Sequence, residues 1–159
     1  MSLISKESDS LPLVISFEVL KMMLLKVSGQ FHQISGEIHF DKNRLNASFF
    51  DIKVDVSSID SKNRKRDEHL KGEDFFDIES HRFIEFKSNK MVKSLEGFYA
   101  VGELKIKDVI KTIDINFFES NDTALSGSLQ LNRKDYKLGD KIPNFIVGNK
   151  IAIEFSLRQ

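Results

Sequence analysis

A chain of 159 residues is typical of one domain and is long enough to bury a substantial hydrophobic core. Its 24 Lys and Arg balance 24 Asp and Glu, which argues against a general binder of nucleic acid or of anionic membranes, because both need a basic excess. The absence of Cys excludes thiol nucleophiles, disulfides and Cys-ligated metal sites. With 14 Phe, two Tyr and no Trp, the aromatic side chains are almost purely apolar, so a cavity built from them would offer few polar groups.

The amino-terminal segment carries no sign of export or of a membrane span. Residues 1–10 mix acids with Ser and lack a basic start followed by an apolar stretch, so they do not form a secretory signal. We predict that they are disordered or tag-derived and that residues 11–159 form a single domain. The most apolar run, residues 11–27, contains one Pro, one Glu and two Lys and is too charged to cross a bilayer. The chain therefore reads as soluble and cytoplasmic, or as periplasmic if a leader has been removed.

Alternation of apolar and polar residues is the dominant pattern, and it predicts β-strands. One face of each segment is apolar, as in Phe50, Ile52 and Val54 against Asp51 and Lys53. Eight strands with short turns are typical of an antiparallel up-and-down barrel or a sandwich. In chain order, the predicted strands are residues 13–20, 34–41, 46–56, 83–91, 98–106, 112–118, 125–131 and 149–157.

Two connections are longer. Residues 58–81 lose the alternation and gain charges, and we predict a short helix over residues 65–71 that is stopped by Gly72. An apolar segment after this helix is expected to cap the barrel wall. Residues 134–148 form the second loop, which contains Pro143.

Several short stretches follow one another in a recognisable order along the chain: VSGQF (27–31), SGEI (35–38), SSID (57–60), RDEHLK (66–71), DFFD (74–77), FIEFKS (83–88), VGELKIK (101–107), LNRKDY (131–136) and VGNKI (147–151). Taken together, they resemble the YceI-like lipid- and polyisoprenoid-binding family. The resemblance implies an eight-stranded, antiparallel, lipocalin-like barrel whose lumen holds a long isoprenoid or fatty-acyl chain. Lys21 departs from it, because the family often has a His at this position.

The residues themselves leave two states of the lumen open. An eight-stranded barrel is just wide enough for packed side chains or for one slender ligand. A cavity would select apolar chains, because stranded polar groups of a guest cost about 1–3 kcal/mol each. The candidate ligand-binding residues of the lumen and its lip are Ile15, Phe17, Val19, Met22, Met23, Phe31, Ile38, Phe40, Phe50, Ile52, Val54, Ile84, Phe86, Leu104, Ile115, Phe117, Leu129, Ile153 and Phe155.

The predicted function is therefore binding of a long apolar lipid for transport, storage or sequestration, without catalysis. We expect no catalytic residue, no metal, no cofactor and no nucleic-acid partner; membrane contact is at most transient, and a homodimer stays open. One alternative is a lipid isomerase or cyclase in the same barrel, which would need an inward titratable group, and only Arg133 and Lys90 lie near strand ends. The other alternative is an interaction module with a packed lumen.

Two surface features also have two interpretations. Met22 to Leu25 would form either a flexible lip at the barrel mouth or a short buried helix that plugs one end. The basic cluster from Lys62 to Arg66 would meet a pyrophosphate or an anionic membrane, or would simply be a solvated loop.

Overall fold

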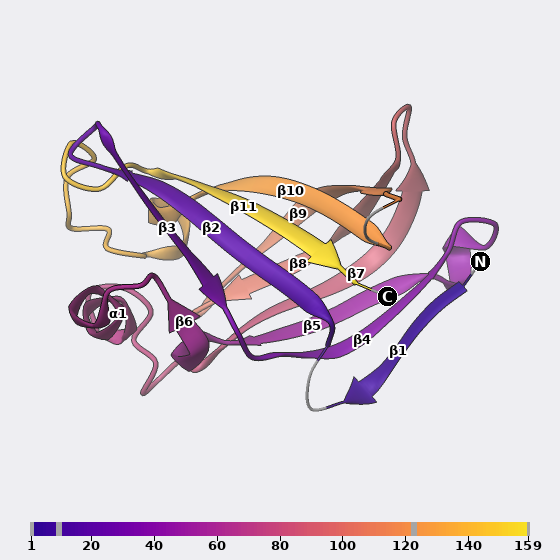
Figure 1. Ribbon diagram of the computed structural model, residues 1–159, viewed down its shortest axis with the longest axis horizontal. Coiled ribbons are helices and arrows are strands. Elements are labelled where there is room, and N and C mark those ends of the chain that lie inside the picture. Colours follow the sequence, from indigo (N-terminus) through magenta and orange to yellow (C-terminus); the bar gives the residue numbers. More distant parts are fainter. Residues whose placement is uncertain (1, 9–10, 122–123, 159) are drawn as a thin grey trace.

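The computed structural model describes residues 2–8, 11–121 and 124–158. The strands of this part form one antiparallel sheet in the order β1-β4-β5-β7-β8-β9-β10-β11-β2-β3-β6, which curls until β2, β3, β10 and β11 lie opposite β4 and β5 (Figure 1). The strands are β1 (Ser2–Ser8), β2 (Leu13–Lys21), β3 (Leu25–Phe31), β4 (Ile34–Asp41), β5 (Phe49–Asp55), β6 (Ile59–Asp60), β7 (Phe83–Lys93), β8 (Phe98–Ile106), β9 (Val109–Glu119), β10 (Leu125–Asn132) and β11 (Lys150–Leu157).

The helices are short. The single α-helix of the described residues, α1 (Arg64–Lys71), lies where the sequence predicts it, at the end of the sheet marked by the β2–β3 turn (Figure 1). The Asn63 side chain accepts a hydrogen bond from the Arg66 amide and caps its first turn. Gly72 follows its last residue in an extended conformation. Three 3₁₀ turns complete the elements: η1 (Leu45–Ala47), η2 (Val56–Ser58) and η3 (Arg133–Tyr136). None of the helices described is long and apolar enough to span a membrane.

The all-β, barrel-like class is confirmed, but the strand count and the closure are not. The eight predicted strands correspond to β2, β4, β5 and β7 to β11, and the structure adds β1, β3 and β6. The curled sheet has β1 and β6 as its two edges within the described residues, so it is not a closed eight-stranded barrel. In β3 the alternation is interrupted by Gly29, where a Cβ atom would lie 2.5 Å from the Phe17 ring. β6 has only two residues, too few to form a pattern.

The amino terminus differs from the expectation of disorder. Ser2–Ser8 forms β1 and pairs antiparallel with β4, with Ser2 opposite Asp41 and Ser5 opposite Ile38. Pairing at a sheet edge uses main-chain hydrogen bonds, so it does not require an alternating sequence. Residues 1, 9 and 10 lie outside the described residues.

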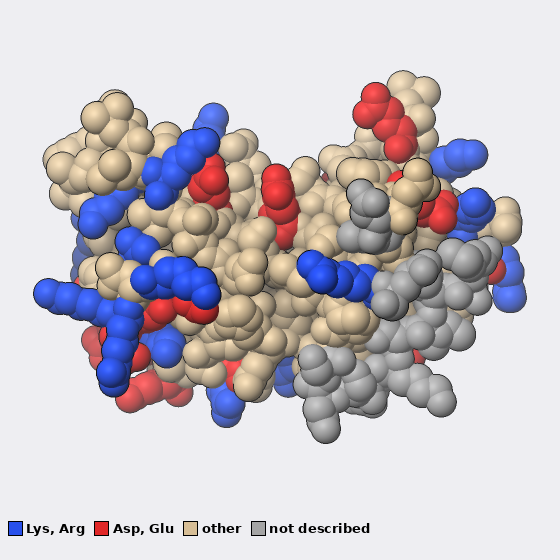
Figure 2. All heavy atoms as spheres, in the orientation of Figure 1, with Lys and Arg blue, Asp and Glu red and all other residues tan. Residues whose placement is uncertain are grey.

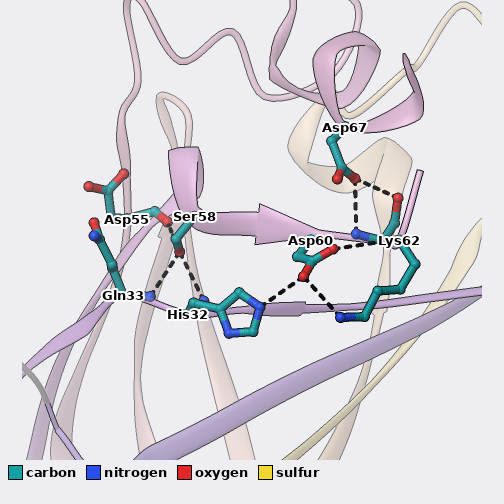
Figure 3. A network of polar contacts seen from close by, with 8 residues as sticks. His32, Gln33, Asp55, Ser58, Asp60, Lys62 and Asp67 are labelled. Atoms are coloured by element: carbon teal, nitrogen blue, oxygen red, sulfur yellow. Dashed lines mark hydrogen bonds and ion pairs between the residues drawn. The ribbon is translucent and has the colours of Figure 1, made fainter. Parts of the chain in front are cut away.

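A polar network joins the two sides of the sheet near its β6 edge (Figure 3). The Ser58 hydroxyl accepts hydrogen bonds from the amides of His32 (3.1 Å) and Gln33 (3.0 Å), in the connection between β3 and β4. The Asp55 amide donates to the Gln33 carbonyl at 2.9 Å. Asp60 accepts from the Lys62 amide at 2.9 Å and lies 3.1 Å from His32 Nε2. These bonds hold β6 and the residues on either side of it against the connection between β3 and β4.

Aromatic residues fill one half of the interior. Phe40 lies with its ring centroid 4.9 Å from that of Phe98 and 5.3 Å from that of Phe117, both in edge-to-face geometry. Phe50 lies 5.0 Å from Phe117, and all four side chains are buried. The alternative of a packed lumen therefore describes this half of the molecule.

Candidate functional site

The other half of the interior is hollow. A cavity of about 620 Å³ lies between β2, β3 and β11 on one side and α1 with the segments after it on the other. The 134–148 loop supplies a further wall through Leu138, Ile142 and Val147. This volume falls within the range of about 300–1,000 Å³ usual for small-molecule sites, and the lining is almost entirely aliphatic and aromatic.

The candidate lumen residues separate into three groups. Six line the cavity: Ile15, Phe17, Val19, Phe31, Ile84 and Ile153. Eleven belong to the packed core or lie against it: Ile38, Phe40, Phe50, Ile52, Val54, Phe86, Leu104, Ile115, Phe117, Leu129 and Phe155. Strand parity places both groups on the inward face, but it does not say how far along the barrel each residue lies.

Met22 and Met23 form the third group, and they do not line the cavity. Both are exposed in the turn between β2 and β3, with 55% and 70% of their surface accessible. The buried plug helix is therefore wrong: this segment is a hairpin turn that extends beyond the sheet (Figure 1). Its neighbours Leu20 and Lys21 line the cavity instead.

Further walls come from the two long connections. Leu70, Phe75 and Phe76 line the cavity beside α1, in agreement with the expected apolar cap. Phe75 packs against Gly139, where an added Cβ would lie 2.7 Å from its ring and where φ is +59°. Tyr136, with 1% exposure, also lines this region, and its apolar surroundings raise the pKa of its hydroxyl. The strand pattern stops before these residues, so period-two reasoning missed Tyr136.

Arg133 organises the 134–148 loop. Its guanidinium is buried and is paired with no carboxylate among the described residues. It donates to the main-chain carbonyls of Leu138, Gly139, Ile142, Val147 and Gly148. Burial lowers the pKa of Arg133, and the nearby charge of Asp140 opposes this shift. Because these carbonyls occupy its donors, Arg133 holds a wall of the cavity and is not a free acid.

The mouth of the cavity lies between α1 and the β2–β3 turn. The exposed residues of the lining all come from this end: Leu20, Lys21, Asn63, Lys65, His69 and Ile146. Arg66 is held by Ser61, to whose hydroxyl and carbonyl it donates at 2.9 and 2.8 Å. Lys62, Arg64 and Lys65 remain exposed near the mouth, where Figure 2 shows blue side chains beside α1.

No acid–base pair stands inside the cavity in the part of the chain that is described. His69 is at the rim, with Nε2 3.4 Å from Asp74 and its ring against Phe75. Asp67 accepts a hydrogen bond from the Ser61 amide at 3.0 Å, and Lys71 Nζ lies 3.6 Å from Glu68, so both side chains have partners outside the cavity. Lys90 is exposed on β7 and does not line the cavity.

Solved structures share this fold. BcnA of Burkholderia cenocepacia superposes with a TM-score of 0.84 at 22% identity, over 91% of this chain and 94% of that one. A YceI protein of Campylobacter jejuni gives 0.73 at 22% identity over 84% of each chain. A polyisoprenoid-binding domain of Saccharophagus degradans gives 0.68 at 13% identity over 94% of each chain.

Sequence relatives point the same way. A UPF0312 protein of Vibrio parahaemolyticus is 33% identical over 102 residues, which are 64% of this chain and 54% of that protein. The match therefore spans about half the length of that relative. The model of the YceI-like domain matches residues 9–159, and the chain belongs to the YceI-like family.

Proposed function

We propose that this protein binds one long apolar chain, an isoprenoid or a fatty-acyl chain, in the cavity between β2 and α1. The observation that carries the proposal is the form of the interior, which is packed with Phe at one end and hollow and apolar at the other. The polyisoprenoid-binding domain of S. degradans, which shares the fold, supports this ligand class. Transport, storage or sequestration of the lipid would follow from such binding.

The energetics favour an apolar guest. Each methylene group moved from water into the cavity contributes about 0.8 kcal/mol. A polar group placed against Ile84 or Ile153 would lose its hydrogen bonds to water and gain none from the wall. The polar atoms of a ligand are therefore expected at the mouth, near Lys21 and Lys65.

We also propose that the protein is not an enzyme. An isomerase or cyclase would need a titratable group that can reach the bound chain. Arg133 donates to carbonyls, and His69 lies at the exposed rim. Tyr136 has almost no accessible surface, so its hydroxyl does not reach a guest without movement of the wall.

Mass spectrometry of organic extracts from the purified protein tests the binding directly. We expect an isoprenoid or a fatty acid in a near-stoichiometric amount, and binding of added isoprenoid by the delipidated protein. Absence of both would contradict the proposal and favour an interaction module.

A pair of variants on one strand locates the ligand. Ile153→Trp places a large side chain in the cavity, whereas Ala152→Trp places the same side chain on the exposed face of β11. We expect the first to abolish binding of a fluorescent fatty acid and the second to leave it unchanged. Equal affinities in folded Ile153→Trp and Ala152→Trp would show that the ligand binds elsewhere.

A further inference from the structure

Large apolar side chains are concentrated on two adjacent turns beside the cavity mouth. Of the thirteen that are exposed among the described residues, seven lie here, and Leu24 is 86% exposed. The two turns are hydrogen-bonded: the Met22 amide donates to the Ile146 carbonyl at 2.9 Å, and the Gly148 amide donates to the Leu20 carbonyl at 2.8 Å. We call this surface the apolar tip; it consists of Leu20, Met22, Met23, Leu24, Leu25, Phe145 and Ile146.

The backbone of the tip is held in a costly conformation. Met22 and Met23 have φ of 54° and 64°, and the Leu24 amide closes the turn on the Lys21 carbonyl at 3.2 Å. Positive φ at both central residues is the geometry that hairpins usually build with Asn-Gly, because a side chain with a Cβ is disfavoured there. Two exposed Met at these positions do not improve stability or packing. We therefore look for their role at the protein surface.

Basic residues surround the tip, although the whole chain is neutral. Residues 19–27 and 141–150, which form the two turns, contain Lys21, Lys26, Lys141 and Lys150 and no acid. Two acids flank these segments in the sequence: Glu18, whose carboxylate lies 3.7 Å from Lys26, and Asp140, which precedes Lys141. Figure 2 shows a tan projection over the β2–β3 turn with blue side chains beside it.

We propose that the apolar tip inserts into the surface of a bilayer that contains anionic lipids, and so places the cavity mouth against the membrane. Apolar side chains surrounded by Lys fit the boundary between acyl chains and anionic head groups. A second copy of the chain fits less well, because symmetric pairing of the tips would bring these Lys residues together. Lys62, which precedes α1, and the exposed Arg64 and Lys65 of its first turn lie across the mouth and would meet the same surface.

The apolar tip lies next to the cavity, so its contact with a membrane would affect how a ligand enters and leaves. Leu20, Lys21 and Ile146 belong both to the tip or its base and to the cavity lining. An apolar chain leaving the cavity at this point would enter the bilayer without crossing water. The membrane contact itself does not depend on which ligand the cavity holds.

The chain has no Trp, so a single introduced Trp reports insertion. Leu24→Trp lies on the tip, and the matched control Leu95→Trp lies in the fully exposed turn between β7 and β8, away from the mouth (Figure 1). With vesicles of phosphatidylcholine and phosphatidylglycerol, we expect the emission of Leu24→Trp to shift to the blue and to be quenched by brominated lipid. Leu95→Trp should not change.

Co-sedimentation measures the affinity for these vesicles without an introduced Trp. We expect Lys26→Gln with Lys141→Gln to weaken binding to these vesicles about tenfold or more. Met23→Ser with Leu24→Ser should also weaken it, and Leu95→Ser should not. The melting temperature and the binding of a fluorescent fatty acid show whether each variant is folded and still binds a ligand in its cavity. A loss of ligand binding is therefore distinguished from a loss of vesicle binding.

Two results would overturn the proposal. One is an emission spectrum of folded Leu24→Trp that does not change when the vesicles of phosphatidylcholine and phosphatidylglycerol are added. The other is a blue shift that appears without vesicles and grows with protein concentration, because this would assign the tip to contact between two copies of the chain.

Discussion

Arg133 and Val147 are joined by a hydrogen bond of 2.8 Å from the guanidinium to the main-chain carbonyl. The same side chain reaches Ile142 at 2.7 Å and Gly148 at 3.0 Å. One residue directly after β10 therefore fixes the loop that forms both a cavity wall and part of the apolar tip. An Arg suits this place because its planar group carries five donors.

Replacing Arg133 by Met is predicted to lower the free energy of unfolding by at least about 3 kcal/mol, because several buried carbonyls lose a charged donor. Urea unfolding measures the loss. The adjacent exposed Lys134→Met is the control and should change stability little. Equal stability of the two variants would mean that water replaces the guanidinium at no cost.

The packed and hollow halves should respond differently to truncation. Phe40 is 1% exposed within the aromatic cluster, and Phe40→Ala is predicted to lower the free energy of unfolding by about 3–5 kcal/mol. Phe17→Ala should cost less, because its ring already borders the cavity. The affinity for a fatty acid should change in Phe17→Ala and stay the same in Phe40→Ala. A large loss of affinity in folded Phe40→Ala would contradict the division into two halves.

The turn between β2 and β3 should be easy to stabilise. Met22→Asn with Met23→Gly supplies residues that accept positive φ, and we predict a gain of about 1 kcal/mol in the free energy of unfolding. Asn43→Gly, in the turn before η1 where φ is not positive, is the control and should give no gain. Thermal unfolding of both variants measures the difference, and a loss of stability in the double variant would count against strain at this turn.

Acid should weaken the network of Figure 3. Hydrogen bonds from the Lys62 amide and from His32 lower the pKa of Asp60 to about 2. Burial opposes the charge of Asp55, but hydrogen bonds from Arg82 and Ser57 outweigh it and lower its pKa as well. A carboxylate with a lowered folded pKa stabilises the protein above its unfolded pKa, near 3.8, and loses this contribution as the pH falls through the folded value.

Stability is therefore predicted to fall between about pH 4 and pH 2. The urea midpoint as a function of pH measures this fall. Asp60→Asn should reduce stability at neutral pH and flatten the acid limb, whereas Asp114→Asn, an exposed residue of β9, should do neither. An acid limb unchanged by Asp60→Asn would show that other carboxylates cause it.

Eight of the eleven described strands, and their inward faces, could be predicted from the sequence, because side chains alternate across a strand and only one face of this sheet is buried. Ala100, Leu104 and Ile106 of β8 are all buried, while Glu103 and Lys105 between them are exposed. The helix could be predicted for a similar reason, from the loss of that period and from Gly72. Both signals are local.

Only the tertiary structure decided where the interior is filled and where it is empty. Phe17 and Phe40 are equivalent in the pattern, yet one borders the cavity and the other lies in a cluster with residues from β8 and β9. The cavity forms between β2 and a loop held by Arg133, more than a hundred residues later, and the positive φ of Met22 is likewise invisible in composition. The alternation of apolar and polar residues shows which face of a strand is buried. A cavity, however, depends on how closely segments far apart in the sequence approach one another, and no local pattern contains that information.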